Sequence, residues 1–298
     1  MCVTCGCGDT ANVRVEGEAG AHAHEHVLAD GTVVRHTHGH TQEHAHGQAQ
    51  VQAHDAGHPH AHGGGATHAH AAYRKEAPTE LVALEAALLA KNQRIAERNR
   101  GWFAGRGVVA LNLMSSPGSG KTSLLVRTLE DLAGEIPMAV VEGDQETSAD
   151  ADRIRATGAA AVQINTGAGC HLEADMLERA LRQLAPATGS LLFIENVGNL
   201  VCPALFDLGE SARVVVLSVT EGDDKPLKYP HMFRRAQLMI TTKLDLAPHV
   251  SFDVALAERH ARSINPTLTC LRVSSTSGAG LDGWYGWLRA MRRLSALS

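Results

Sequence analysis

Residues 115–122 constrain the fold of this 298-residue chain more than any other segment, and they read Ser115-Ser116-Pro117-Gly118-Ser119-Gly120-Lys121-Thr122. This is the form of a phosphate-binding loop, with Ser115 in place of the usual leading glycine. Such a loop joins a buried strand to a helix, and the apolar run 108–114 and the amphipathic stretch 121–132 supply both. The sequence therefore predicts a nucleotide-binding domain.

Short apolar runs alternate with amphipathic stretches through the rest of the chain, which is typical of a parallel sheet covered by helices on both faces. The runs that predict buried strands are 108–114, 138–141, 160–164, 191–194, 214–219, 238–242 and 268–273. The stretches that predict helices are 79–99, 121–132, 148–156, 172–184, 252–263 and 283–294. The predicted fold class over 78–298 is α/β, a doubly wound and mostly parallel sheet.

The chain before this domain has a different composition. Residues 1–8 hold three cysteines, and fourteen of the 18 histidines precede residue 78. The linker 9–77 has too few large apolar side chains to bury a core, so we expect it to be disordered without metal. The predicted organisation is a cysteine motif at 1–8, a His-rich linker at 9–77 and a folded domain at 78–298.

The phosphate-binding loop assigns roles to individual residues. Its glycines let the backbone approach the phosphates, Lys121 neutralises the β and γ oxygens, and the Thr122 hydroxyl is placed to ligate Mg²⁺. The predicted phosphate-binding residues are Gly118, Ser119, Gly120, Lys121, Thr122 and Ser123.

Two acidic residues at strand ends are the candidates for Mg²⁺ binding and catalysis beside Lys121. Glu195 opens an acid-x-x-Gly sequence, in which the carboxylate reaches Mg²⁺ and the Gly198 amide meets the γ-phosphate. Asp144 follows another strand, and it could ligate Mg²⁺ or orient the attacking water. The alternative for Asp144 is an N-cap of the helix that begins near Thr147.

The sequence Thr242-Lys243-Leu244-Asp245 ends the predicted strand 238–242 and favours guanine over adenine. A carboxylate at Asp245 accepts hydrogen bonds from both N–H groups on the guanine edge, and the Lys243 stem can cover the base. Thr242 replaces the usual Asn, so we expect the bracing of the loop to come from elsewhere. Ser275 lies after the next strand, where a base-contacting loop is expected.

Three thiolates at Cys2, Cys5 and Cys7 can wrap around one ion because glycines separate and follow them. Together with the α-amine they would suit planar Ni²⁺, and tetrahedral Zn²⁺ is the closest rival. The alternative is an N-terminus with no metal-binding role, but it would leave three exposed thiols open to oxidation for no benefit. The alternating histidines of 22–70 predict weak exchanging sites suited to metal storage, with a solvated linker as the alternative.

A third group of metal ligands is predicted inside the folded domain. Cys170, His171 and Cys202 would each usually be core residues. However, Cys202 lies four residues beyond Gly198, so one segment would carry a phosphate contact and a metal ligand. We expect adjacent Cys170 and His171 not to converge with Cys202 within one chain, which favours a site shared between two protomers.

Composition argues against other classes of partner. The formal net charge of −5 gives no electrostatic footprint for nucleic acid or anionic membrane, so we expect neither. The N-terminus lacks the basic start and apolar run of a signal peptide, and we see no apolar stretch long enough to span a bilayer. We expect a cytoplasmic protein, whose cysteines serve as ligands more than as disulfides.

Five further motifs carry a resemblance to a known family. They are Cys-x-x-Cys-Gly-Cys at 2–7, Glu-Gly-Asp-Gln-Glu-Thr at 142–147, Gly-Cys-His-Leu-Glu-Ala-Asp-Met at 169–176, Glu-Asn-Val-Gly-Asn-Leu-Val-Cys-Pro at 195–203 and Thr-Glu-Gly-Asp-Asp-Lys-Pro-Leu-Lys-Tyr-Pro at 220–230. With the phosphate-binding loop, they resemble the HypB family of hydrogenase nickel-insertion GTPases. The cysteine-containing motifs separate the chain from the similar urease accessory GTPases.

The resemblance implies a slow GTPase that uses GTP and Mg²⁺, forms a homodimer and delivers Ni²⁺ to the large-subunit precursor of [NiFe]-hydrogenase together with a HypA-type metallochaperone. It also implies that Cys2, Cys5 and Cys7 form a high-affinity nickel site, and that Cys170, His171 and Cys202 form a second site for Ni²⁺ or Zn²⁺. Two other classes stay open: a nickel or zinc storage protein with incidental GTPase activity, and a P-loop kinase.

Overall fold

The computed structural model describes residues 14–15, 24–27, 33–36, 79–145 and 147–295. These residues belong to two units. Strand β1 (Arg14–Val15) belongs to the unit that contains 79–295, and strands β2 (His24–Val27) and β3 (Val33–His36) pair antiparallel in the second unit. The predictions for the rest of 1–77, including the cysteine motif, concern residues outside this description.

Seven parallel strands form the central sheet, and an antiparallel strand extends it. The parallel strands are β4 (Val109–Ser115), β5 (Met138–Asp144), β6 (Ala160–Asn165), β7 (Leu191–Glu195), β8 (Ala212–Ser218), β9 (Leu238–Thr242) and β10 (Thr269–Arg272). They are ordered β6-β5-β7-β4-β8-β9-β10, and β1 pairs with β6 at the edge. The mostly parallel α/β sheet predicted from the sequence is confirmed, with strand ends within three residues of their predicted positions.

The predicted helices are also present. They are α1 (Thr79–Arg106), α2 (Lys121–Asp131), α3 (Ala149–Ala156), α4 (Ala174–Leu184), α7 (Val254–Ile264) and α8 (Leu281–Ser295). Helix α1 continues seven residues beyond its predicted end at 99, because Phe103 is 2% exposed and packs in the core while the two glycines of this turn face outward. Four short helical segments had not been predicted: η2 (Cys202–Ala204), α5 (Lys225–Lys228), α6 (Pro230–Arg234) and η3 (Leu244–His249).

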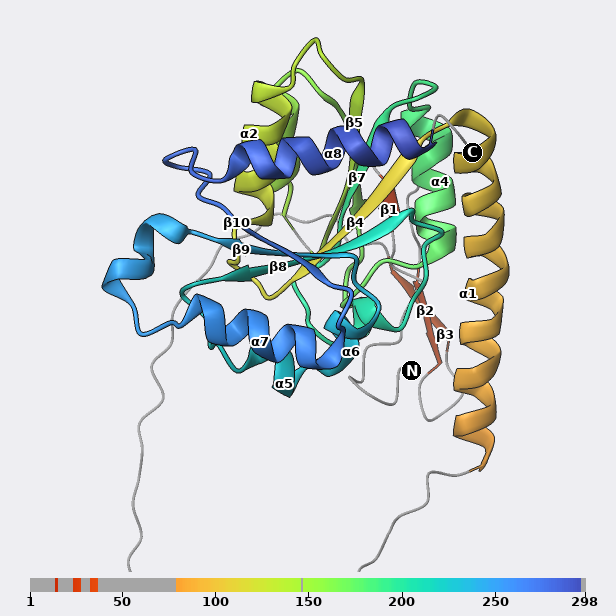
Figure 1. Cartoon of the computed structure of the whole chain (residues 1–298). Helices are drawn as coiled ribbons and strands as arrows, with labels where there is room; N and C mark the ends of the chain where they lie inside the picture. The colour runs from red at the N-terminus through yellow and green to blue at the C-terminus, as the bar shows by residue number, and fades with distance from the viewer. Residues whose placement is uncertain (1–13, 16–23, 28–32, 37–78, 146, 296–298) are drawn as a thin grey trace, which may run out of the picture. The chain divides into compact units, whose positions relative to one another are not determined.

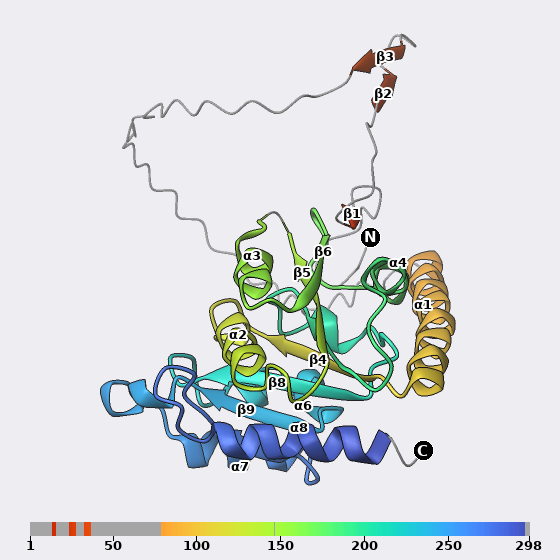
Figure 2. The same cartoon turned by 90° about the horizontal axis from the view of Figure 1, so that it is seen from above.

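Helices cover both faces of the sheet, as Figures 1 and 2 show. Apolar residues of α2, α3 and α8 pack on one face, and those of α1, α4, α6 and α7 pack on the other. The largest fully buried side chain is Trp284 of α8, whose indole N–H donates to the Thr128 hydroxyl of α2 at 2.9 Å. The central strands β4, β7, β8 and β9 are buried along their whole length, and they consist largely of aliphatic residues.

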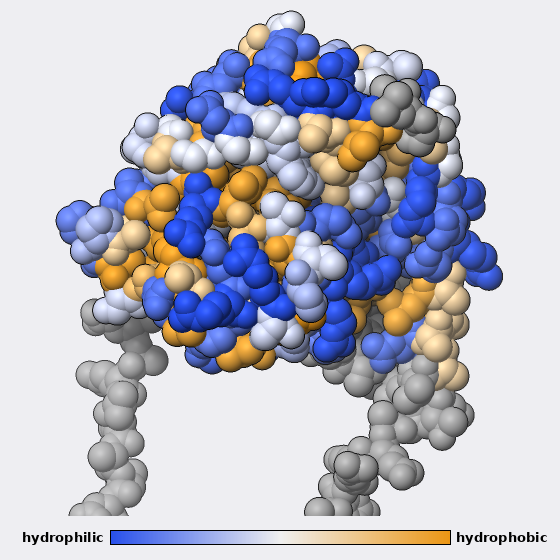
Figure 3. Space-filling model, in the orientation of Figure 1, coloured by the Kyte–Doolittle hydropathy of each residue, from blue (hydrophilic) through white to orange (hydrophobic). Residues whose placement is uncertain are grey.

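The strand order decides where a ligand can bind. Strands β5, β7 and β4 are neighbours, so the loops that follow them meet at one edge of the sheet. A crevice outside the carboxyl ends of parallel strands is where α/β sheets bind their ligands. None of the described helices is long and apolar enough to cross a membrane. On the coloured surface in Figure 3, hydrophilic residues are interspersed with apolar ones.

Candidate nucleotide and metal sites

The phosphate-binding loop follows β4 and leads into α2, as predicted. Gly120 has a φ of 92°, a left-handed conformation that favours glycine. The Lys121 side chain is buried, and its Nζ donates to the Ser115 hydroxyl at 2.7 Å. Burial lowers the pKa of Lys121, and the nearby Glu195 carboxylate opposes this effect. The Lys121 ammonium group of the loop therefore lies in a site with little water.

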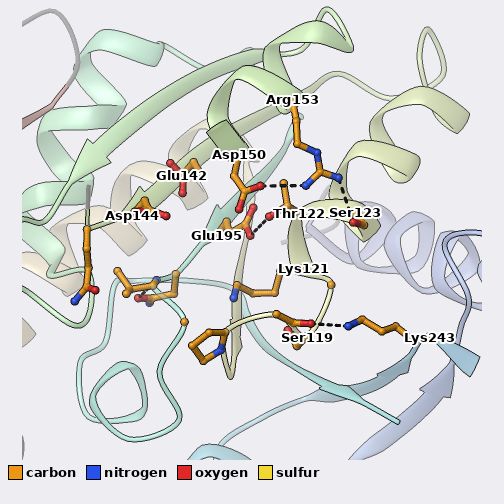
Figure 4. A pocket seen from close by; sticks show the side chains of 18 residues that line it. Ser119, Lys121, Thr122, Ser123, Glu142, Asp144, Asp150, Arg153, Glu195 and Lys243 are labelled. Carbon is orange, nitrogen blue, oxygen red and sulfur yellow. Dashed lines mark hydrogen bonds and ion pairs between the residues drawn. The ribbon is translucent and has the colours of Figure 1, made fainter. Parts of the chain in front are cut away.

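Thr122 and Glu195, both predicted near Mg²⁺, are in direct contact. The Thr122 hydroxyl donates to Glu195 Oε1 at 2.7 Å (Figure 4). The other carboxylate oxygen, Oε2, is buried and has no hydrogen-bond partner among the described residues. Burial raises the pKa of Glu195 to about 7, against the lowering effects of Lys121 and Thr122. A buried oxygen without a partner is a position that a cation or its water can fill.

A second buried carboxylate, Glu142, lies beside Glu195 and had not been predicted as a site residue. The two residues are neighbours in the register of β5 and β7, and Glu142 lines the same cavity. Its Oε2 is likewise buried without a partner in the part of the chain that the structure describes. Burial raises the pKa of Glu142 to about 9, and the neighbouring Glu195 and Asp144 add to the shift. The donor set suits a hard cation such as Mg²⁺.

Asp144 ends β5 at the wall of this cavity. Its Oδ1 accepts a hydrogen bond from the Thr147 amide at 3.2 Å. Because α3 begins at Ala149 after Ser148, Asp144 caps a turn before the helix, and the alternative role as the N-cap of α3 is wrong. Its carboxylate lies close to the other acidic residues in Figure 4, so the prediction that it faces the nucleotide site is consistent with the geometry.

Helix α3 adds two residues to the cavity that sequence reasoning missed. Arg153 donates to the Asp150 carboxylate at 3.0 Å and to the hydroxyl of Ser123, in the first turn of α2, at 3.2 Å. Asp150 and Arg153 both line the cavity. Their spacing in the sequence is that of an ordinary exposed helix pair. They reach the cavity through the pairing of β5 with β7 and the path of the chain after β5.

The loop after β9 holds the phosphate-binding loop from the side of the predicted base site. The Thr242 hydroxyl donates to the Ser119 carbonyl at 2.6 Å, and Lys243 Nζ donates to the Gly118 carbonyl at 2.7 Å. The expectation that bracing would come from elsewhere is therefore wrong, because Thr242 itself supplies it. The Lys243 backbone itself is in the left-handed region, with a φ of 55°.

Asp245, predicted to bind guanine, is exposed at the start of η3. Its Oδ1 accepts a hydrogen bond from the Ser274 hydroxyl of the next loop. The predicted base contact at Ser275 is adjacent, and the Ser275 carbonyl accepts a hydrogen bond from Arg127 at 3.2 Å. The structure thus brings the two predicted base-binding segments together, with Ser274 as the residue that orients the carboxylate.

Gly198 lies directly against the phosphate-binding loop. A Cβ atom at this position would be 3.0 Å from Pro117 Cα and N, so a side chain would push on the loop. The whole nucleotide cavity has a volume of about 420 Å³ and is lined by the phosphate-binding loop, the ends of β5 and β7, α3 and Lys243. All predicted nucleotide-binding residues except Asp245 and Ser275 line it.

The predicted metal ligands Cys170, His171 and Cys202 form one cluster. Their ligand atoms all lie within 4.8 Å of one another in a single chain. The expectation that adjacent Cys170 and His171 could not converge with Cys202 is therefore wrong. The turn of residues 165–169 after β6 and the 3₁₀ turn η2 after β7 bring them together. Two thiolates and an imidazole suit Zn²⁺ or Ni²⁺.

Close neighbours orient the His171 ring and favour its protonated form, so a metal ion that binds here must displace that proton. Its Nδ1 is 3.6 Å from Cys170 Sγ, its Nε2 is 3.7 Å from the Glu173 carboxylate, and its ring stacks on Phe206 at 3.9 Å. Burial acts to lower the pKa of His171, but Cys170 and Glu173 outweigh it and raise the pKa to about 9. Burial acts to raise the pKa of Cys170, and hydrogen bonds with His171 and Cys202 lower it overall.

Comparison with known proteins agrees with this geometry. The family model described as CobW/HypB/UreG, nucleotide-binding domain, matches residues 109–272. Hydrogenase maturation factor HypB of Rhizobium leguminosarum bv. viciae is 58% identical over 208 residues, 70% of this chain and 70% of the relative. That of Escherichia coli (strain K12) is 56% identical over 212 residues, 71% of this chain and 73% of the relative. The chain belongs to the HypB family.

Solved structures of the HypB family have the same fold. Hydrogenase maturation factor HypB from Archaeoglobus fulgidus is 42% identical and aligns with a TM-score of 0.64 over 68% of this chain and 99% of that one. HypB from Helicobacter pylori, solved in complex with nickel, is 41% identical with a TM-score of 0.64 over 68% and 95% of the two chains. The HypB family assignment inferred from the motifs is confirmed.

Proposed function

We propose that this chain is a GTP-hydrolysing nickel metallochaperone that delivers Ni²⁺ to the large-subunit precursor of [NiFe]-hydrogenase. The observation that carries the proposal is the segment 195–202. It begins with Glu195, which contacts Thr122 of the phosphate-binding loop, passes Gly198 against Pro117 and ends at the metal ligand Cys202. One short segment thereby joins a nucleotide site to a transition-metal site.

The nucleotide site supports GTP hydrolysis. Lys121 and the loop amides would bind the phosphates, and Asp245 would select guanine. Mg²⁺, when bound, neutralises charge on the β- and γ-phosphates. Thr122 and Glu195 would hold it, with Asp144 placed to ligate it or to orient the attacking water, and the buried unpaired oxygens of Glu195 and Glu142 fit such an ion.

The metal cluster supports transient binding of a cargo ion. Cys170, His171 and Cys202 provide three donors, and an ion with four ligands needs one more from water or a partner. A three-donor site releases its ion more readily than a closed four-donor site. Ni²⁺ is proposed as the cargo, and Zn²⁺ as a competing or structural occupant. Cys2, Cys5 and Cys7, with the His-rich linker, are proposed to acquire and store nickel.

Transfer also needs partners. By the resemblance, we propose that GTP closes a homodimer and that a HypA-type metallochaperone and the hydrogenase precursor bind in turn, in the cytoplasm. GTP would shift metal affinity only if the cluster binds metal unequally in the two nucleotide states, and the effect of metal on nucleotide affinity must then be reciprocal.

The test is a metal titration of the full-length chain with Cys2→Ser, Cys5→Ser and Cys7→Ser, bound first to GDP and then to a non-hydrolysable GTP analogue with Mg²⁺. The charge-transfer absorption of thiolate-bound Ni²⁺ reports Cys170 and Cys202 and is insensitive to histidines of the linker. We expect affinities that differ between the two nucleotide states by fivefold or more, about 1 kcal/mol. Equal affinities would separate GTP hydrolysis from metal delivery at this cluster.

A further inference from the structure

Two buried asparagines, one within the sheet and one directly after a strand, lie where aliphatic residues are expected. Asn112 of β4 is 0% exposed, and Asn196, which directly follows β7, is 1% exposed. Transfer of an amide side chain into a core without partners costs roughly 2 kcal/mol or more, so such residues persist where their hydrogen bonds do something specific. The side-chain oxygen and nitrogen of each asparagine have a hydrogen-bond partner, and these partners show which segments the two residues connect.

Asn196 holds the backbone beside the metal ligand His171. Its Oδ1 accepts from the Leu172 amide at 3.1 Å and from its own neighbour Val197 at 3.0 Å. Its Nδ2 donates to Asn112 Oδ1 at 3.2 Å, which fixes the orientation of the carboxamide. Leu172 directly follows His171, so the position of the imidazole depends on this contact.

A second asparagine in the same segment holds the other half of the cluster. Asn199 Oδ1 accepts from the Val201 amide at 2.7 Å and from the Cys202 amide at 3.4 Å. These bonds close the turn that leads into η2 and set the direction of the Cys202 side chain. Asn199 is only partly buried, in contrast to Asn196.

The buried network continues behind the cluster. Asn112 Nδ2 lies 3.4 Å from Glu210 Oε1, which also accepts from Arg213 Nε at 2.6 Å. Arg213 in turn donates to the Ala204 carbonyl at 3.1 Å, at the end of the turn that contains Cys202. One chain of buried polar groups therefore runs from the His171 side of the cluster, through the sheet, to the Cys202 side.

We infer that Asn196 and Asn199 are positioning residues for the metal cluster, and that they carry the effect of nucleotide state to it. Both lie between Glu195, at the nucleotide, and Cys202, at the metal. A displacement of the end of β7 on GTP binding would move Asn196 and with it the Leu172 amide, and would move Asn199 and with it the Cys202 amide. The part of this inference that concerns nucleotide state rests on the proposed function. The positioning of the metal ligands by the two asparagines does not depend on it.

The experiment compares Asn196→Ala and Asn199→Ala in the full-length chain with the three tail cysteines replaced by serine. Metal affinity is measured by the Ni²⁺–thiolate absorption with GDP and with a non-hydrolysable GTP analogue, and thermal unfolding is followed in parallel. Loss of a residue that orients metal ligands typically weakens affinity by about 10- to 100-fold. We expect such a loss for Asn196→Ala, a smaller one for Asn199→Ala, and a ratio between nucleotide states that approaches one in both.

Two controls separate positioning from general stability. Asn265 is also a buried asparagine, and it donates to the carbonyls of Phe233 and Ala236 at 3.0 and 2.8 Å. Asn265→Ala should lower the melting temperature without a specific loss of metal affinity. Asn199→Asp keeps an acceptor oxygen on a partly exposed side chain, and it should restore the affinity that Asn199→Ala loses.

The outcomes are distinguishable. Affinities of Asn196→Ala and Asn199→Ala within twofold of the parent protein would overturn the positioning role. If Asn196→Ala does not fold, the pair of Asn199 variants decides the question alone: a loss with alanine that aspartate restores supports the inference, and no loss overturns it. If the parent protein itself binds metal equally in both nucleotide states, the proposed coupling fails, while the affinities still decide whether the asparagines position the ligands.

Discussion

The buried carboxyl of Glu142 predicts how the stability of the chain depends on pH. Burial raises the pKa of this group from its ordinary value of 4.5 to about 9. The folded chain therefore keeps a proton that the unfolded chain has already lost above its ordinary pKa. Because the folded state binds more protons, the free energy of unfolding must fall as the pH rises from about 4.5 to about 9.

The magnitude follows from the same pKa values. Each pH unit within this window changes the free energy of unfolding by about 1.36 kcal/mol for one proton. From pH 5 to pH 8 the contribution of Glu142 is then a loss of about 4 kcal/mol, as an upper limit that water entry or a bound cation would reduce. Glu142→Gln keeps the shape of the protonated side chain and removes its titration.

The assay is urea unfolding of the nucleotide-free, Mg²⁺-free chain at pH 5 and pH 8, followed by circular dichroism. We expect Glu142→Gln to be more stable than the parent at pH 8 by up to about 4 kcal/mol and close to it at pH 5. Glu130→Gln, on the exposed face of α2, is the control and should follow the parent at both pH values. Parallel pH dependences for Glu142→Gln and the parent would refute the reasoning.

Three further substitutions test the nucleotide site. Thr242→Val removes the hydrogen bond to the Ser119 carbonyl. We expect GDP affinity, measured by a fluorescent-nucleotide titration, to weaken five- to tenfold, or by about 1 kcal/mol. Unchanged affinity would contradict the bracing role. Gly198→Ala places a methyl group 3.0 Å from Pro117, and we expect calorimetry to show nucleotide binding weakened by about 1–3 kcal/mol. Unchanged affinity would show that the loop accommodates the methyl group. Asp245→Asn replaces an acceptor with a donor, so competition should show preference shifting from GTP to xanthosine triphosphate; retained GTP preference would remove Asp245 from base recognition.

The sequence was sufficient for the sheet and for the phosphate-binding loop, since both depend on local patterns. Buried parallel strands appear as apolar runs, and the glycine-lysine-threonine spacing appears between a strand and a helix. The short helices α5 and α6 were missed because four or five residues are too few for a helical period. Helix α1 ran past its predicted end because tertiary packing of Phe103 outweighs the helix propensity of the glycines beside it.

The site was harder to predict where it depends on pairing between strands. Glu142 opens the motif at 142–147, but nothing in the local pattern marks it as a site residue. It enters the cavity because β5 lies beside β7 in register with Glu195. Asp150 and Arg153 are unremarkable until α3 is placed over the phosphate-binding loop. Thr242 could not be recognised as a brace, since the hydrogen bond that defines it spans 123 residues of sequence.

The two hydrogen bonds from Thr242 and Lys243 also bear on how long a nucleotide stays bound. They tie the loop after β9 to the carbonyls of Ser119 and Gly118, so these two parts of the site are already joined before any ligand binds. A preformed site captures nucleotides with little reorganisation, whatever their base. A base that strains the loop after β9 would also disturb these contacts to the phosphate-binding loop, so we expect discrimination among bases to appear in the residence time.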